Sequence, residues 1–198
     1  MASSLQPHQQ ILAAELRAYR GVDEVEESFR VTILDLVESD ERWWHRDTMP
    51  GHITASAFII SPQLDCLLLH FHRKLDRWLQ VGGHDDGEKH PAHTVLREVF
   101  EESGLAQFDF FGEPTIFDLD IHPIPAKGKV PAHNHLDVRY LLVADPEQPL
   151  NPAPGESSQI KWFRLVDAEE KMNEAGAVRV LRKISTLADA MANAKCQT

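Results

Sequence analysis

The first part of the chain carries apolar residues at the spacing of amphipathic helices. In residues 7–20 and again in 23–38, apolar side chains recur every three or four positions, as they do on one face of an α-helix. Asp23 stands where a side chain can cap the second helix at its N-terminus. We therefore expect a two-helix extension over residues 1–48, which packs on the rest of the chain or forms the contact of a homodimer.

From about residue 49 the pattern changes to short apolar runs separated by turn residues, which is typical of β-strands. The runs predict strands at 53–60, 66–72, 77–81, 115–121, 135–143 and around 160–163. Residues 91–103 and the chain from Asp167 onward return to helical spacing. Strands before and after helices, without regular βαβ alternation, predict an α/β fold with a mixed sheet between helices over residues 49–198.

The composition makes some classes of binding partner more compatible with this chain than others. The chain has 20 Lys and Arg against 31 Asp and Glu, a net charge of −11, which works against binding a nucleic acid polymer. A small phosphorylated substrate is still compatible, because bound cations reverse the local sign of charge. No apolar run approaches the roughly 20 residues that span a bilayer, so we expect no membrane association. Two cysteines, Cys66 and Cys196, and a start without a basic leader segment predict a cytoplasmic protein without a disulfide framework.

The segment 82–105 concentrates carboxylates. It contains Asp85, Asp86, Glu88, Glu98, Glu101 and Glu102. On a helix the last three fall within an arc of about 100°, where like charges repel one another. Cations would neutralise them, and ligands that are all oxygen favour Mg²⁺ or Mn²⁺. The alternative is a solvated acidic helix face, but a proline at the start, a glycine at the end and a preceding Gly-Gly pair favour a metal site.

This segment resembles the Nudix box, G-x5-E-x7-R-E-U-x-E-E-x-G-U, in which U is a bulky apolar residue. Its second half, residues 97–105, matches without exception. In the first half, Gly82 and Glu88 keep the family spacing, but eight residues instead of seven then precede Arg97. Counted back from the helix, Gly83 takes the glycine position and a lysine takes that of the glutamate. The role of Glu88 is therefore open.

The resemblance implies a Nudix-type α/β/α sandwich and a divalent-metal-dependent hydrolase. Its substrate would be a nucleoside diphosphate linked to another group, in which water attacks a phosphorus atom while cations neutralise the diphosphate oxygens. Arg97 would orient a glutamate, and Glu98 would also act in catalysis. The expected metal ligands are Glu98, Glu101, Glu102 and a backbone carbonyl of Gly82 or Gly83.

Other residues are candidates for catalysis or substrate binding. Glu156, in a late loop, is expected to be a further metal ligand or the general base, unless it is only a polar loop residue. Polar residues alternate along the predicted strand at 133–139, and alternate residues of a strand share one face. This polar face could line a substrate cleft, accept a proton or bind a second metal; the alternative is a hydrated sheet face. Trp78 and His84 flank the glycine pair and could contact a substrate. The alternating set is His133, His135, Asp137 and Arg139.

Two other functions are compatible with the same fold. Isopentenyl-diphosphate isomerase needs a cysteine immediately before a Gly-His in the glycine loop, whereas here residues 81–84 read Val-Gly-Gly-His. A non-catalytic module that senses nucleotides should have lost helix carboxylates, which this chain keeps. The substrate stays open among ADP-ribose, a (deoxy)nucleoside triphosphate, a dinucleoside polyphosphate and a nucleotide sugar.

Overall fold

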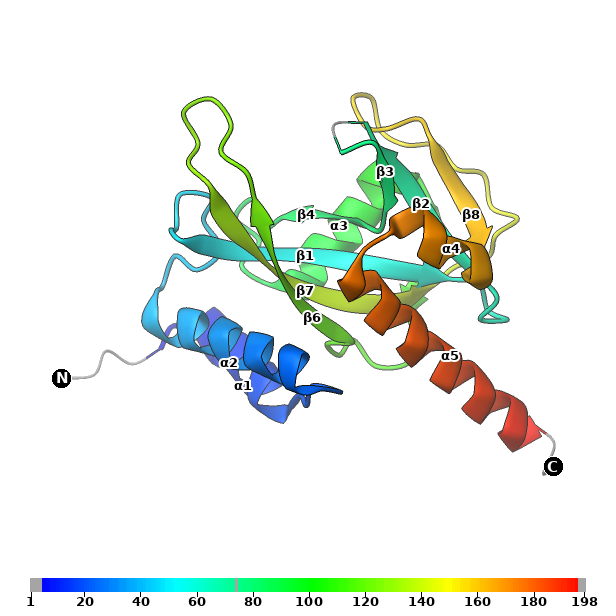
Figure 1. Ribbon diagram of the computed structural model, residues 1–198, viewed down its shortest axis with the longest axis horizontal. Coiled ribbons are helices and arrows are strands. Elements are labelled where there is room, and N and C mark those ends of the chain that lie inside the picture. Colours follow the sequence, from blue (N-terminus) through cyan, green and yellow to red (C-terminus); the bar gives the residue numbers. More distant parts are fainter. Residues whose placement is uncertain (1–4, 74, 196–198) are drawn as a thin grey trace. The chain divides into compact units, whose positions relative to one another are not determined.

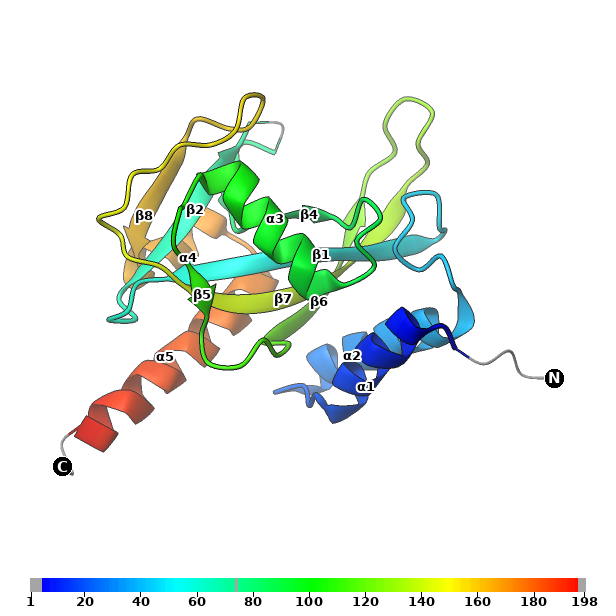
Figure 2. The same ribbon diagram turned by 180° about the vertical axis from the view of Figure 1, so that it is seen from behind.

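The computed structural model describes residues 5–73 and 75–195. Within them, five helices and a mixed sheet confirm the predicted α/β class (Figures 1 and 2). In chain order the elements are α1 (Pro7–Ala18), α2 (Glu24–Ser39), β1 (Gly51–Ile60), β2 (Cys66–His72), β3 (Arg77–Leu79), β4 (Val81–His84), α3 (Pro91–Ser103), β5 (Asp109–Phe110), β6 (Asp118–Ile124), β7 (His133–Val143), β8 (Ile160–Arg164), α4 (Leu165–Met172) and α5 (Ala175–Lys195).

The long strands β1 and β7 are neighbours in the sheet and lie side by side in both views (Figures 1 and 2). The sheet order is β3-β2-β1-β7-β5, with β4 paired to β1, β6 to β7 and β8 to β2. By compactness the described chain divides into a first unit (up to 57, with 82–98 and 112–140) and a second unit (58–81, 99–111 and from 141 onward).

In the first unit, the N-terminal helices pack on the sheet through buried polar contacts. Glu26 of α2 is buried, and its carboxylate accepts hydrogen bonds from the backbone N–H of Leu119 (3.1 Å) and of Val22 (2.8 Å). The hydroxyl of Tyr19 donates to the carbonyl of Phe117 at 3.0 Å. The helices therefore belong to the body of this unit, and a domain boundary between residues 48 and 49 stays a prediction.

Strand β6 and strand β7 form an antiparallel pair whose register sets the two faces of the first unit's sheet. Asp118 lies opposite Arg139, Leu119 opposite Val138 and Asp120 opposite Asp137. Because side chains alternate along each strand, apolar residues share one face and the acidic and basic residues share the other.

The second unit has its own apolar core around β2. Leu67, Leu68 and Leu69 are fully buried, and β2 pairs antiparallel with both β3 and β8. Helices α4 and α5 add buried side chains such as Met172 and Ile184. Burial of large aliphatic side chains contributes about 1.5–3 kcal/mol each, so this apolar core stabilises the strands.

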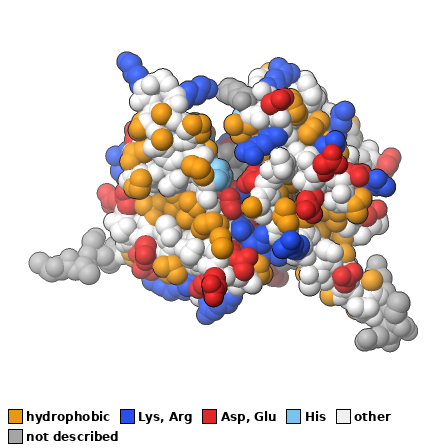
Figure 3. Space-filling model, viewed as in Figure 1, with side chains coloured by type: hydrophobic (Ala, Val, Ile, Leu, Met, Phe, Trp, Pro, Cys, Tyr) orange, Lys and Arg blue, Asp and Glu red, His pale blue; other side chains and the backbone are white. Residues whose placement is uncertain are grey.

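The surface, the helices and one of the two cysteines can be described individually. On the face shown in Figure 3, the described acidic and basic side chains are interspersed, with no continuous basic field. None of the helices among the described residues has both the length and the hydropathy of a membrane span. Cys66 is a free, half-buried thiol, whereas Cys196 lies outside the described residues.

Candidate active site

Arg97 and Gly83 hold the first glutamate of the α3 carboxylate set in place. The Nη1 of Arg97 donates to Oε1 of Glu98 at 2.9 Å, and its Nη2 donates to the carbonyl of His84 at 2.7 Å. The Glu98 side chain is 12% exposed. A Cβ atom at Gly83 would lie 2.3 Å from Oε1 of Glu98, so a side chain at this position would displace the carboxylate from its present place.

The two glycines of the pair have different surroundings. Gly82 lies against β1, where an added Cβ would meet the carbonyl oxygen of Ala55 at 2.5 Å and the side chain of Ser56. Gly83 is the glycine beside Glu98. A carbonyl of Gly82 or Gly83 as a metal ligand stays a prediction.

The extra residue of the motif is taken up in the loop that joins β4 to α3. Asp86, Gly87 and Lys89 all have positive φ (51°, 103° and 57°). Asp85, which is buried, stabilises this turn because its Oδ1 accepts hydrogen bonds from the backbone N–H of Gly87 (3.0 Å) and of Lys89 (2.7 Å). Burial raises the pKa of the Asp85 carboxyl.

As a result of this turn, Glu88 still reaches the helix. Its Oε1 lies 3.5 Å from Nε of Arg97, a longer and more exposed contact than that between Arg97 and Glu98. The loop therefore brings Glu88 into contact with Arg97, although the spacing between the two residues departs from the family pattern.

Glu102 lies further along α3 and is buried. Its Oε1 is 3.4 Å from Nδ1 of His70 on β2. Burial lowers the pKa of His70 to about 4, so this imidazole is neutral at pH 7. Glu98, Glu101 and Glu102 are at i, i+3 and i+4 of one continuous helix, the spacing at which side chains share a face.

The loop that carries Glu156 is anchored to the end of the same helix. The backbone N–H of Ala153 donates to the carbonyl of Glu101 at 2.7 Å, and that of Asn151 donates to the carbonyl of Ser103 at 2.9 Å. Gly104 ends the helix at φ +67°, and an added Cβ would lie 2.1 Å from the Asn151 carbonyl oxygen. Glu156 itself is exposed, and its backbone N–H donates to the carbonyl of Ala153.

The alternating residues of β7 have two different environments. Arg139 is 1% exposed and Asp137 is buried as well. Nε of Arg139 donates to Asp137 at 2.9 Å, and its two other nitrogens lie 3.4 Å from Asp118 and 3.1 Å from Asp120. Both groups are thus enclosed and paired within the sheet, and their expected contact with substrate stays a prediction.

The other two alternating residues, His133 and His135, are half-buried and belong to a histidine cluster of the first unit. His84, which the sequence singled out, lies in the same cluster, with ring centroids 4.8 Å apart between His84 and His135. Sequence reasoning missed His52 and His122, whose rings lie 5.2 Å and 5.5 Å from that of His135. Each of the two adjoins a predicted strand, 53–60 or 115–121, but only the strand pairing in the structure places them beside the alternating set.

Trp78 lies in the second unit among aromatic rings. Its ring centroid is 4.7 Å from that of Phe163 and 5.4 Å from that of Phe71, and Nζ of Lys161 lies 5.8 Å from it. The ring is half-buried, so most of it packs inside the unit while one part stays accessible.

Comparison with known proteins identifies the family of this arrangement. A family model described as the NUDIX domain matches residues 50–184. A hydrolase of the NUDIX family from Clostridium perfringens is 26% identical with a TM-score of 0.52, and the alignment covers 69% of this chain and 97% of that one. The Ap4A hydrolase of C. elegans, in a binary complex, is 20% identical with a TM-score of 0.55 (70% and 98% covered).

A third similar structure is the dihydroneopterin triphosphate pyrophosphohydrolase of E. coli, at 14% identity and a TM-score of 0.52, with 68% of this chain and 95% of that one covered. At these identities the second and third structures show a shared fold alone. The search of curated proteins gave no match.

Proposed function

Since the chain belongs to the Nudix family and is a hydrolase, we propose that it uses Mg²⁺ or Mn²⁺ to hydrolyse a diphosphate linkage in a nucleotide derivative. The observation that carries this proposal is the carboxylate of Glu98, which Arg97 holds against the backbone of Gly83. A glutamate fixed in this way loses little conformational freedom when it binds a cation, which favours binding.

The residues present fit a hard divalent cation. Glu98, Glu101 and Glu102 offer carboxylate oxygens, the ligands that Mg²⁺ and Mn²⁺ prefer. Glu102 supports this fit, because it lies one helical turn from Glu98 on the same helix, where side chains share a face. Divalent cations bound there would supply Lewis-acid chemistry, neutralising diphosphate oxygens and strengthening water as a nucleophile.

Side chains of the protein would orient the metal ligands, the water and the substrate. Arg97 positions Glu98 and ties it to β4 through the His84 carbonyl. We propose Glu156 as the general base, since its loop is hydrogen-bonded to the backbone of Glu101 and its exposed side chain is accessible to water and substrate. The accessible part of Trp78 is proposed to stack on the base of the nucleotide, as aromatic rings do with bases.

A hydrolysis screen tests the proposal. The full chain is assayed with Mg²⁺ and with Mn²⁺ against ADP-ribose, nucleoside triphosphates, dinucleoside polyphosphates and nucleotide sugars. We expect turnover of at least one class, dependent on the metal, and loss of that turnover in Glu102→Gln. The matched control is Glu113→Gln, an exposed glutamate in the loop before β6, which should keep wild-type turnover.

Two results would contradict the proposal. One is nucleotide binding by the folded protein without hydrolysis of any class, which would indicate a sensing module. The other is a Glu102→Gln variant that turns over substrate as fast as the Glu113→Gln control.

A further inference from the structure

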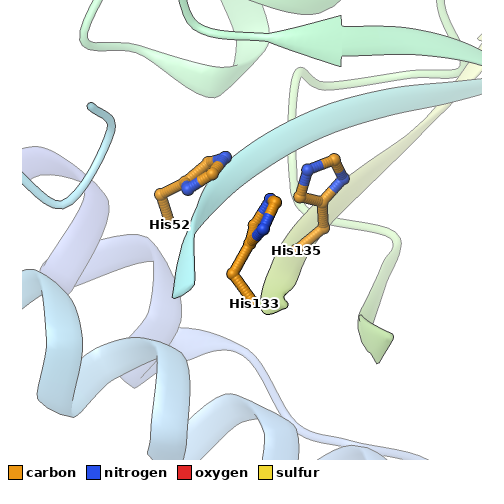
Figure 4. A group of neighbouring side chains, drawn as sticks. All are labelled: His52, His133 and His135. Carbon is orange, nitrogen blue, oxygen red and sulfur yellow. The ribbon is translucent and has the colours of Figure 1, made fainter. Parts of the chain in front are cut away.

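Five histidines of the first unit lie together outside the carboxylate helix. Their ring centroids are between 4.8 and 5.5 Å apart in six pairs. The five are His52, His84, His122, His133 and His135. Three of them, His52 at the start of β1 and His133 and His135 at the start of β7, have ring nitrogens that all lie within 4.8 Å of one another (Figure 4).

His52 is the least expected of these side chains. It is 1% exposed, and neither ring nitrogen has a well-formed hydrogen bond to the described residues, with the backbone of Thr48 as a polar neighbour. A buried polar group without a hydrogen bond costs about 1–3 kcal/mol. Coordination of a cation would satisfy this ring, whose nitrogens face the other two imidazoles in Figure 4.

His133 is oriented as metal-binding histidines are. Its Nδ1 lies 3.0 Å from the carbonyl oxygen of Pro131. A carbonyl only accepts hydrogen bonds, so Nδ1 carries the proton and Nε2 of the neutral ring keeps a free lone pair. In metal sites, the ring nitrogen that does not bind the metal commonly donates its hydrogen to a backbone carbonyl or a carboxylate, which fixes the tautomer.

The cluster also suits neutral ligands. His52, His133 and His135 each offer one ring nitrogen, and a neutral imidazole binds a metal through the lone pair of such a nitrogen. Imidazole nitrogens suit Zn²⁺, Ni²⁺, Cu²⁺ and Fe²⁺, whereas Mg²⁺ prefers oxygen. The donor set therefore differs in kind from the glutamates of α3.

We propose that His52, His133 and His135 form a binding site for a transition-metal dication of the Zn²⁺ type. Three protein ligands leave a coordination position for water or another ligand, as in open zinc sites. With Zn–N distances of about 2.0–2.1 Å, tetrahedral ligands lie roughly 3.4 Å apart. The three ligand nitrogens lie within 4.8 Å of one another, so each distance between them would have to shorten by at most about 1.4 Å. Side-chain rotation can supply a change of this size.

Co²⁺ titration of the full chain tests the site, because Co²⁺ bound by several nitrogens absorbs visible light. The titration is done in excess Mg²⁺, so that oxygen sites are filled. We expect one equivalent of Co²⁺ to bind and Zn²⁺ to displace it. His133→Ala and His135→Ala should each weaken binding by more than about a hundredfold, the upper range for loss of a second-shell partner. His93→Ala, an exposed histidine outside the cluster, should bind as the wild type does.

Two further measurements distinguish loss of the histidine site from unfolding and from loss of the carboxylate site. Circular dichroism of each metal-free variant establishes that it is folded, with His133→Gln as the milder replacement. Glu102→Gln should retain the Co²⁺ spectrum in full, so a failure of the proposed hydrolase site leaves this result intact. The proposal is overturned by absence of the visible bands, by wild-type affinity in either histidine variant, or by loss of the bands in Glu102→Gln.

Discussion

Replacing Arg139 by methionine should strongly destabilise the protein, because this guanidinium is the shared partner of three buried carboxylates. Its nitrogens lie 2.9–3.4 Å from Asp118, Asp120 and Asp137, and all four side chains are almost fully enclosed. Methionine fills similar volume but carries no charge, so the variant would leave three acidic groups without their cation.

The magnitude follows from the burial. Removing one partner of a buried ion pair costs about 3–5 kcal/mol, since the other charge is left uncompensated. In a chain of 198 residues, each kcal/mol shifts Tm by about 2–4 °C. Arg139→Met should therefore lower Tm by about 6–20 °C at neutral pH, measured by circular dichroism and checked by urea denaturation.

An exposed ion pair provides the control. Arg46 lies 2.7 Å from Asp86, and their side chains are 56% and 49% exposed. Pairs of this kind contribute about 0–1 kcal/mol, so Arg46→Ala should lower Tm by no more than about 4 °C. A loss in Arg139→Met no larger than in Arg46→Ala would refute the reasoning, because it would mean that the buried acids do not depend on the guanidinium.

Three further predictions concern carboxylates. Glu102→Gln should lower metal-dependent turnover by more than about a hundredfold but raise the Tm of the metal-free protein, since it removes the like-charge repulsion with Glu98 one helical turn away; both effects are read from steady-state kinetics and a thermal melt in chelator. Glu88→Gln should cost less activity than Glu98→Gln, because Glu88 makes the longer contact with Arg97, and equal losses in kcat would contradict this. Burial raises the pKa of Glu15 in the folded protein, so its carboxylate charge destabilises the fold as pH rises from the unfolded-state pKa to the folded-state pKa. Glu15→Gln should therefore raise Tm by a few degrees at pH 7. The gain should vanish near pH 3, where Glu15 is protonated in both the folded and the unfolded protein.

The sequence predicted which residues of β7 share a face but not how deeply each is buried. Alternation in a strand is a local property, so it could be read directly from residues 133–139. Depth depends on neighbours from distant parts of the chain: Thr54 and Ser56 of β1 donate hydrogen bonds to Asp137, and β6 supplies the acids that surround Arg139. No pattern within one strand contains that information.

The helix of the carboxylates was predictable for the same reason, whereas the loop before it was not. Helical spacing, a proline at the start and a glycine at the end indicated residues 91–103, and α3 has those bounds. The loop conformation rests on positive φ at Asp86 and Lys89, which non-glycine residues adopt rarely. The side chain of Asp85 stabilises that turn, so the contact between Glu88 and Arg97 could be found only from the structure.

The polar side chains of β7 have two environments because burial changes along the strand. At the start of the strand His133 and His135 are half-buried, so a ligand bound there could exchange with solvent. Two residues further on, Asp137 is enclosed, and an ionisable group in that position must be paired within the protein. One alternating pattern thus yields a proposed metal site at the accessible end and a structural ion cluster at the enclosed end. His135→Ala should therefore weaken Co²⁺ binding and leave Tm nearly unchanged, whereas Arg139→Met should lower Tm, since the two residues lie in different environments on the same face.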